Sequence, residues 1–478
     1  MNLSRRSLLY AGLPSVAGLW TAVAFPASCA AQSSAVTPER FGAKGDGRTN
    51  DTDAFAAMAA HINARGAGEV VLRRTTYLVG RQVQAGRSGA SYAFEPAPIL
   101  ELKGLSGPLI IRGNGAVLRC SPGLRYGTFD PVSGVATDRP LPYYSGGELA
   151  SPYRAMIKVE DCSGPIKISD LELDGDVERW VIGGGYGDTG RQIGASGLVL
   201  ANNRGAEHIV RVHSHHHGLD GVLIDGFDGE RPSASLLEGV RCEYNGRQGC
   251  SIVGGRRYQF RDCRFAHTGR SKVSSAPGAG VDIEAEAGKR VRDLKFVDCT
   301  FDDNAGCGMV AATGDSEGAL FNRCTFVGTT SWSAWPNKPR IRFDACRFIG
   351  PVVNAHGNQD PAQATQFVGC VFRDDPSLSP TGEIYGGGNP ERPIADLPFS
   401  LNVLFKRCRF ILTHLAALPW STTVIYEDCE MSQTSPANSY PRGFYQGRNI
   451  IRGMPNLGGS VNRGQLIING KQFPVGRI

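Results

Sequence analysis

Apolar residues in the middle of the chain recur in pairs of short segments, at intervals far too long for a helical stripe. An aromatic residue is followed by a Cys three positions later and by a second aromatic two positions after that, as in Phe260-Arg-Asp-Cys263-Arg-Phe265. Full or degenerate copies place cysteines at positions 242, 263, 299, 324, 346, 370, 408 and 429. Most steps between them are 21–25 residues, and two longer steps leave room for inserted loops. Such a period is typical of a solenoid.

Each repeat offers short aromatic and β-branched pieces separated by Gly, Asn and Asp, which excludes a helical repeat. Three short strands and three bends fit into one period at a rise of about 3.3 Å per residue. The pattern therefore predicts an all-β fold, a single-stranded right-handed parallel β-helix, in which equivalent side chains form ladders along the axis.

Cys263 and Phe265 are two residues apart and face the same way, whereas Phe260 is out of phase with them. A bend between two strands would let both aromatic residues point inward. Disulfides or a metal site are the alternative for the cysteines, but the chain has no close Cys-x-x-Cys pair and each turn repeats one inward position. A ladder of small buried thiols is the favoured interpretation.

The first residues have the pattern of an export signal. Ser4-Arg-Arg-Ser-Leu-Leu9 precedes an apolar run to Phe25 and small residues at 27–31, which predicts a twin-arginine signal peptide over residues 1–31. Gly and Pro interrupt the run, which argues against a transmembrane anchor. Cys29 leaves a lipoprotein as an alternative, although Pro26 stands where such signals have an aliphatic residue. We expect a periplasmic or secreted protein that is exported folded, with thiols that survive oxidation.

The chain has 478 residues, of which 20% are charged, and a net charge of +6. No dense basic run is present, so a nucleic-acid partner is not expected. Nothing after the signal is long and apolar enough to span a membrane. The mild positive charge is compatible with an anionic polysaccharide.

A helix is predicted after residue 50. Asp51 or Thr52 can cap its start, and Gly66 can end it. One apolar stripe runs along it, formed by Phe55, Met58, Ala59 and Ile62. This helix would cover the open end of the coil, as solenoids require.

The segment Phe41-Gly-Ala-Lys-Gly-Asp-Gly47, followed by Asp51-Thr52 and a Thr76-Tyr77 turn, resembles the N-terminal motif of the pectate-lyase-like superfamily, which has rhamnogalacturonase and epimerase relatives. Arg73-Arg74 replace the Pro-Ala or Pro-Pro usual before the turn. The resemblance implies the pectin-lyase-type β-helix. That group includes hydrolases, lyases, an epimerase and phage tailspikes, so the motif does not fix the chemistry, and its acidic residues are expected to be structural.

The predicted β-helix covers residues 32–431, and a C-terminal cap follows over 432–478. Runs rich in Gly and Pro interrupt the coil as loops near 121–153, 174–196, 268–280, 329–340 and 373–402.

Polar residues gather in the bend after the Cys-x-aromatic strand in four successive turns. The bends hold His213–His217 with Asp220; Tyr244, Asn245, Arg247 and Gln248; His267, Arg270 and Lys272; and Asp302–Asn304. Turns stacked about 4.8 Å apart would bring these side chains into one patch.

Val281 and Ile283 alternate with Asp282 and Glu284, and Glu286 follows. If the apolar pair faces the core, the two carboxylates share the outer face with Cα atoms about 6.6 Å apart. Such a pair could serve as acid and base of a glycosidase or, with Glu286, as a Ca²⁺ site. A solvated strand face is the third possibility.

His213, His215 and His217 also alternate and could share a face that binds a transition metal, although no matching partner cluster is evident. A neutral His is also a suitable general base, and a structural role stays open. Trp332 and Trp335 in the 329–340 segment could hold sugar rings or fix that segment to the coil.

We therefore expect an exported enzyme that cleaves an acidic, uronate-containing polysaccharide by β-elimination. The carboxylate of the uronate would be neutralised by Arg247, Arg270 and Lys272, or by Ca²⁺ bound to Asp282, Glu284 and Glu286. His217 would remove the proton. His267 or Tyr244 would protonate the leaving oxygen. His215 and Gln248 would bind substrate.

A glycoside hydrolase is the alternative, with Asp282 or Glu284 as acid and Asp220 or the partner carboxylate as base. The Asn-Thr-Asp and Arg-Ile-Lys motifs of polygalacturonase-type hydrolases are absent. A non-catalytic carbohydrate-binding β-helix or a sugar epimerase is the third possibility, and no cofactor beyond Ca²⁺ is expected.

Overall fold

A computed structural model describes residues 35–478 of the chain, apart from 85–92, 138–148, 185–192, 386–391, Pro232, Ala287 and Leu415. The predicted export signal over residues 1–31, with Cys29, lies outside the described residues. In the described part of the chain, no helix is long and apolar enough to cross a membrane.

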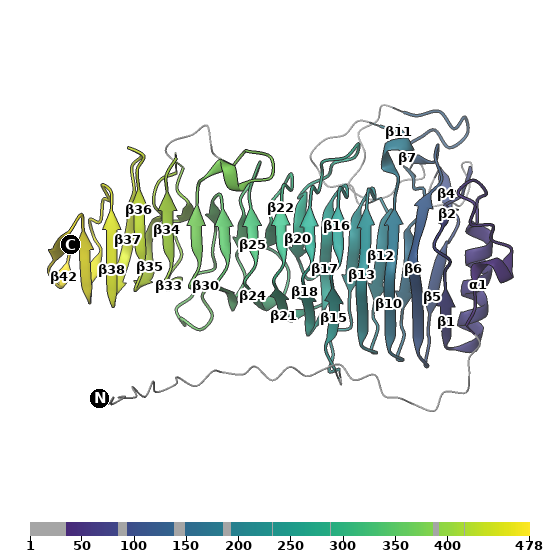
Figure 1. Cartoon of the computed structure of the whole chain (residues 1–478), viewed down its shortest axis with the longest axis horizontal. Coiled ribbons are helices and arrows are strands. Elements are labelled where there is room, and N and C mark those ends of the chain that lie inside the picture. Colours follow the sequence, from purple (N-terminus) through teal and green to yellow (C-terminus); the bar gives the residue numbers. More distant parts are fainter. Residues whose placement is uncertain are drawn as a thin grey trace, which may run out of the picture. The chain divides into compact units, whose positions relative to one another are not determined.

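Short strands stack in parallel along one axis (Figure 1). They fall into three ladders, which we number in the order in which the chain visits them in one turn. The first ladder contains β1 (Gly68–Val71), the starts of β6 (Leu109–Cys120), β10 (Ile166–Asp174) and β13 (Glu207–His215), then β15 (Ser235–Glu238), β18 (Tyr258–Arg261), β21 (Val291–Val297), β24 (Ser316–Asn322), β27 (Ile341–Asp344), β30 (Gln366–Val368) and β33 (Leu404–Lys406).

The second ladder begins with β2 (Thr76–Val79) and the ends of the long strands β6, β10 and β13. It continues through β16 (Arg241–Glu243), β19 (Arg264–Ala266), β22 (Thr300–Asp302), β25 (Thr325–Val327), β28 (Arg347–Ile349), β31 (Val371–Arg373), β34 (Arg409–Leu412), β36 (Glu430–Gln433), β38 (Arg448–Arg452) and β40 (Gln465–Ile468).

The third ladder contains β5 (Leu100–Lys103), β9 (Ala155–Glu160), β12 (Ser196–Ala201), β14 (Asp220–Asp225), β17 (Gln248–Arg256), β20 (Ala279–Ile283), β23 (Met309–Ala311), β26 (Ala334–Pro336), β29 (Val352–Val353), β32 (Ala395–Leu397) and β35 (Trp420–Glu427). The predicted parallel β-helix is confirmed.

The parallel stacking continues past residue 431, where the sequence placed the start of a cap. β37 (Tyr440–Gln446), β38 and β40 still pair in parallel with the preceding turn. The chain then reverses: β41 (Lys471–Phe473) and β42 (Gly476–Arg477) pair antiparallel with β40 and with β39 (Val461–Asn462), respectively.

Two segments expected as plain loops contribute to a separate small sheet. It contains β3 (Gln82–Gln84), β4 (Phe94–Pro96), β7 (Arg125–Thr128), β8 (Leu149–Ala150) and β11 (Val181–Gly183). Phe94 and Phe129 form its own small core, with ring centroids 5.6 Å apart. Short 3-10 turns lie at Pro38–Phe41, Val177–Arg179 and Pro376–Leu378.

The helix α1 (Thr52–Arg65) lies at the β1 end of the coil (Figure 1) and buries the predicted apolar stripe. Its C-cap Gly66 has φ 69°, a left-handed conformation that glycine adopts without strain. The Asp51 carboxylate accepts hydrogen bonds from the backbone N–H groups of Lys44 and Gly45 at 2.7 and 3.0 Å. It therefore fixes the Gly-rich segment, a structural role as expected.

The predicted inward ladders of aromatic and Cys residues are present. Asp262 and Asp298, each just before a Cys, have φ of 50° and 56°, and this bend turns both flanking strands inward. Phe260 and Phe296 stack at 4.3 Å, and Phe296 and Phe321 at 4.6 Å. The cysteines of the described residues are free and buried. Each buried Phe contributes about 1.5–3 kcal/mol, so the stack stabilises these turns substantially.

Candidate active site

Two glycines determine which residues of the third ladder face outward. A Cβ added to Gly221 would lie 3.0 Å from Cβ of Cys242, and one added to Gly249 would lie 3.3 Å from Cβ of Phe265. Both neighbours belong to the core, so these glycines face inward, where a side chain would not fit. Gln248, the residue before the second glycine, faces outward because its side chain reaches Asp282. Asp220, the residue before the first glycine, lies opposite Gln248 in the β14–β17 register.

Asp282 also faces outward, as predicted, because Val281 and Ile283 on either side of it are core residues. It pairs in register with Ser251 on β17 and with Val310 on β23. Val310 in turn pairs with Trp335 on β26. The outer face of the third ladder thus carries a row from Ser251 through Asp282 to Trp335.

Asp282 is only 6% exposed although it lies on the outer face. Gln248 Nε2 donates a hydrogen bond to Asp282 Oδ2 at 2.7 Å, and Gln248 Oε1 accepts one from the Ala279 N–H at 3.1 Å. The second bond fixes the orientation of the amide, so the carboxyl faces a donor. Burial, and then the charge of Glu284, raise the pKa of Asp282 to about 7.

Asp220 is 2% exposed. Burial raises its pKa to about 6, while the positive charge of Arg247 opposes the rise. Asp220 Oδ1 and Arg247 Nε are buried atoms that find no hydrogen-bond partner among the described residues. Buried polar atoms are usually paired, so these two mark a place that suits a polar ligand. The negative charge of Asp220 also raises the pKa of Asp282, so the two carboxyls influence each other.

The predicted calcium set is not assembled. Glu284 Oε1 accepts a hydrogen bond from Thr313 Oγ1, and Glu286 is exposed. In the part of the chain that the structure describes, two groups of side chains bring metal-ligating atoms together, and neither includes Asp282.

The structure places the predicted base His217 inside the coil and not on its outer face. Its ring is fully buried, with Nδ1 2.7 Å from the Tyr153 hydroxyl and Nε2 3.1 Å from the Leu173 carbonyl. It follows β13 rather than lying on it, and the turn points it inward beside Gly197. Burial lowers its pKa well below the usual value, which keeps the ring neutral. His217 is therefore structural.

His213 and His215 stay on the outer face of β13, with ring centroids 4.3 Å apart. In the neighbouring bend, Tyr244 stacks between His216 and His267 at 5.0 and 4.5 Å. The predicted patch therefore exists, but it divides into a histidine group on the second ladder and the carboxyl pair on the third.

Three other residues of the predicted patch, His267, Arg270 and Lys272, are held by protein partners. His267 Nδ1 is 2.9 Å from Asp303 Oδ2, and Arg270 Nη2 is 3.1 Å from Asp303 Oδ1. Lys272 Nζ donates to the carbonyls of Trp180 and Glu178 at 2.8 and 3.2 Å. These contacts join the 268–280 loop to the 3-10 turn at Val177–Arg179 and the residue after it, so Lys272 has a structural role.

The two tryptophans differ. Trp335 lies on β26, a strand of the coil rather than a loop, and its Nε1 is buried without a partner among the described residues. Trp332 packs against Trp335 and Tyr385, at 5.5 and 5.3 Å between ring centroids. Trp332 thus supports Trp335, which alone joins the row that contains Asp282.

Sequence reasoning missed Glu172 and Glu243, which flank the outward-facing histidines His213 and His215. Glu172 lies on β10 opposite His213, and Glu243 lies on β16 opposite His215. Glu243 Oε2 is 2.9 Å from His213 Nε2. Glu243 was within reach, because it stands two residues before Asn245 in the bend pattern. Glu172 was not, since its turn lacks the Cys-x-aromatic signal that fixes the register.

The protein-family comparison identifies residues 189–347 as a right-handed β-helix region. The chain contains a right-handed parallel β-helix. The described turns outside that range extend the same coil in both directions.

Among curated proteins, an 82-residue stretch is 38% identical to a capsule KN3-specific depolymerase of Klebsiella phage KN3-1. The match covers 17% of this chain and 10% of that protein. 

Solved structures of similar fold include the A-module of mannuronan C-5 epimerase AlgE4 from Azotobacter vinelandii, at 14% identity over 91% of this chain and 97% of the module, with a TM-score of 0.43. The N-terminal fragment of gene product 12 of bacteriophage Phi29 is also 14% identical, over 92% of this chain and 73% of the fragment, with a TM-score of 0.46. At such identities the likeness concerns the fold alone.

Proposed function

We propose that this protein is a polysaccharide-cleaving enzyme that hydrolyses a glycosidic bond with Asp282 as general acid and Asp220 as general base. The observation that carries the proposal is a pair of buried, outward-facing carboxyls whose pKa values are raised to about 7 and about 6. Two titratable groups with pKa values moved toward the working pH are what acid–base catalysis requires.

Between about pH 6 and pH 7, Asp282 is mostly protonated and Asp220 mostly ionised. Because Gln248 donates to Oδ2 of Asp282, the acidic proton belongs on Oδ1. That proton passes to the glycosidic oxygen as its bond to the anomeric carbon breaks. Asp220 takes a proton from a water that attacks the same carbon, and the products are a free reducing end and an alcohol.

The spacing favours inversion of configuration. Asp220 lies two strands away from Asp282 and opposite Ala279, three residues before Asp282, so the two Cα atoms are about 14 Å apart by the usual strand spacing and rise. Inverting hydrolases place their carboxyls about 6.5–9.5 Å apart to leave room for water, whereas retaining ones need about 5 Å. The alpha or beta configuration of the first-formed product, observed by proton NMR, tests this assignment.

The substrate class follows from the outer row and from the phage relative. Trp335 offers a half-buried aromatic face two turns beyond Asp282, which suits a sugar of an extended chain. Similarity to a capsule-specific depolymerase supports a capsular or comparable bacterial polysaccharide. The export signal predicted over residues 1–31 would bring the enzyme to such a polymer outside the cytoplasm.

Uronate elimination is the second candidate, and Arg247 favours it. Its Nε is buried and unpartnered beside Asp220, a position where it could neutralise a uronate carboxylate. The expected base His217 is structural, so Asp220 would remove the proton in this scheme. Asp282 would still protonate the leaving oxygen.

One assay separates the two. The protein is incubated with capsular, uronate-containing and neutral polysaccharides, and reducing ends and ultraviolet absorbance are followed together. Hydrolysis releases reducing ends without new absorbance, and this release disappears with Asp282→Asn. Rising absorbance would replace hydrolysis by elimination. Undiminished cleavage by Asp282→Asn would overturn both schemes.

A further inference from the structure

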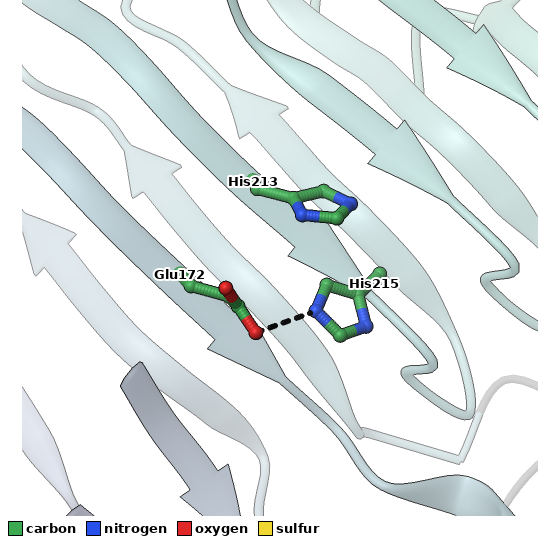
Figure 2. Close-up of side chains that lie close together, drawn as sticks. All are labelled: Glu172, His213 and His215. Atoms are coloured by element: carbon green, nitrogen blue, oxygen red, sulfur yellow. Dashed lines mark hydrogen bonds and ion pairs between the residues drawn. The ribbon is translucent and has the colours of Figure 1, made fainter. Parts of the chain in front are cut away.

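A second group of side chains, separate from the carboxyl pair, lies on the second ladder. Glu172 on β10 and His213 and His215 on β13 project from one outer face, where Glu172 and His213 are in register. Figure 2 shows the carboxylate and the two rings side by side. One potential ligand atom from each residue lies within 4.8 Å of the others.

The second nitrogen of each ring already has a partner. His213 Nε2 is 2.9 Å from Glu243 Oε2, and His215 Nδ1 is 2.7 Å from His216 Nδ1. This leaves Nδ1 of His213 and Nε2 of His215 for an ion, and the latter is 3.3 Å from Glu172 Oε1. The carboxylate beside His213 Nε2 has the position of the outer carboxylate that commonly orients a metal-binding histidine, although this ion-pair contact does not have hydrogen-bond geometry.

Glu243 is itself firmly positioned. Arg241 and Arg264 donate to it at 2.8 and 2.7 Å, so the carboxylate is ionised and available as an acceptor for His213. The arrangement therefore has an ordered outer layer, which a chance cluster of histidines lacks.

The group opens to solvent. Glu172 and His213 line a groove with about 880 Å³ of open space, together with Arg74, Asn114, Asp170 and Arg211. An ion bound by the three side chains would keep a free coordination position toward this groove, which a water or an anionic ligand could fill.

The other group of ligating side chains, Asp174 with His215 and His216, is less suitable. Asp174 already accepts hydrogen bonds from Arg119 Nε at 2.6 Å and from the Asp176 N–H at 2.9 Å. His215 and His216 use their Nδ1 atoms on each other.

We propose that Glu172, His213 and His215 form a binding site for a divalent first-row transition-metal ion of the Zn²⁺ class. Two imidazoles and one carboxylate suit such ions, whereas Ca²⁺ and Mg²⁺ prefer oxygen ligands alone. The site lies on a different ladder from Asp220 and Asp282, and it does not depend on the proposed hydrolysis.

The test uses the full chain after chelator treatment and dialysis, titrated with Zn²⁺ by calorimetry and with Co²⁺ by visible absorption. We expect one equivalent to bind, and Co²⁺ to show the absorption of a four-coordinate site. Glu172→Gln, whose side chain is 38% exposed, should fold normally and weaken binding by at least about tenfold. His215→Ala should abolish stoichiometric binding.

Two further variants separate a built site from general histidine affinity. Glu243→Gln should weaken Zn²⁺ binding by about 10–100-fold, the usual effect of an outer partner. His356→Ala, which alters a histidine in another turn, should bind like the unaltered protein. The proposal would be overturned if the unaltered protein bound no stoichiometric Zn²⁺. It would also be overturned if Glu172→Gln and His215→Ala bound Zn²⁺ as tightly as the unaltered protein.

Discussion

The turns between residues 207 and 311 and those between 341 and 431 share one backbone and one core but differ on the outside. In the later turns, outward charged residues pair at the surface, as in Arg342–Asp344 at 2.8 Å and Lys406–Glu427 at 2.7 Å. In the earlier turns, outward Asp220 and Asp282 are buried and raised in pKa. The inward ladders determine the fold, and the outward positions are free to carry chemistry.

The largest expected effect is on kcat, and it should differ between two aspartates of the same outer row. Asp282 and Asp396 both belong to the row that continues from Trp335 through Val353. Loss of a general acid typically costs about 10²–10⁴-fold in rate, so Asp282→Asn should lower kcat by that factor. Asp396→Asn should leave kcat within about twofold, since burial raises the pKa of Asp396 without a second carboxyl nearby. Equal losses in both variants would remove the distinction between the two regions.

A core substitution should affect stability instead of chemistry. Phe321 is buried and stacks on Phe296 and Phe343 at 4.6 and 5.0 Å. Phe321→Ala should reduce the free energy of unfolding by about 3–5 kcal/mol. Denaturant unfolding measures this loss, and kcat per folded molecule should be unchanged. A large fall in kcat at full folding would show that core and outer face are not independent.

The buried acid should make stability depend on pH. The pKa of Asp282 is about 7 in the folded protein, above its unfolded value. Between about pH 4 and pH 7 the folded protein holds a proton that the unfolded chain has lost. The free energy of unfolding therefore falls as the pH rises, by about 1.4 kcal/mol per pH unit in this range. Asp282→Asn should therefore be more stable than the unaltered protein at pH 8, with the difference shrinking toward pH 4.

Thermal unfolding at both pH values measures this difference, with Asp344→Asn as the control in the later turns. A constant difference across the pH range would mean that Asp282 is ionised in the folded protein at low pH, contrary to its burial.

The smallest effect concerns sugar binding. Trp335→Ala should raise KM by up to roughly tenfold, the equivalent of about 0.5–1.5 kcal/mol of ring contact, with kcat little changed. Trp332→Ala, which removes only the supporting ring, should have a smaller effect on KM. Initial rates over a range of polymer concentrations distinguish the two, and an unchanged KM in Trp335→Ala would exclude this tryptophan from the substrate path.

The fold was predictable because its cause is periodic: Phe260, Cys263 and Phe265 recur, and each copy reports the same inward geometry. The outward direction of Asp282 was likewise visible in the alternation with Val281 and Ile283. The sequence pattern does not predict how deeply Asp282 is buried, because burial depends on segments distant in the chain.

His217 shows a second limit. Alternation along the strand placed it beside His213 and His215, but β13 ends at His215 and the turn rotates His217 into the core. The length of a strand is set by the turns stacked against it. For the same reason the partnership of Glu172 with His213 follows from the register of two strands, which a single sequence does not state.

The carboxyl pair can be examined most directly without any substrate, by NMR titration of protein labelled with ¹³C at the aspartate carboxyls. Two resonances should titrate near pH 6 and pH 7, one disappearing in Asp220→Asn and the other in Asp282→Asn. In Asp220→Asn the remaining pKa should also fall, because the charge of Asp220 raises that of Asp282. Aspartates that all titrate below about pH 5, within the ordinary range for this residue, would contradict the assignment of these two residues as acid and base.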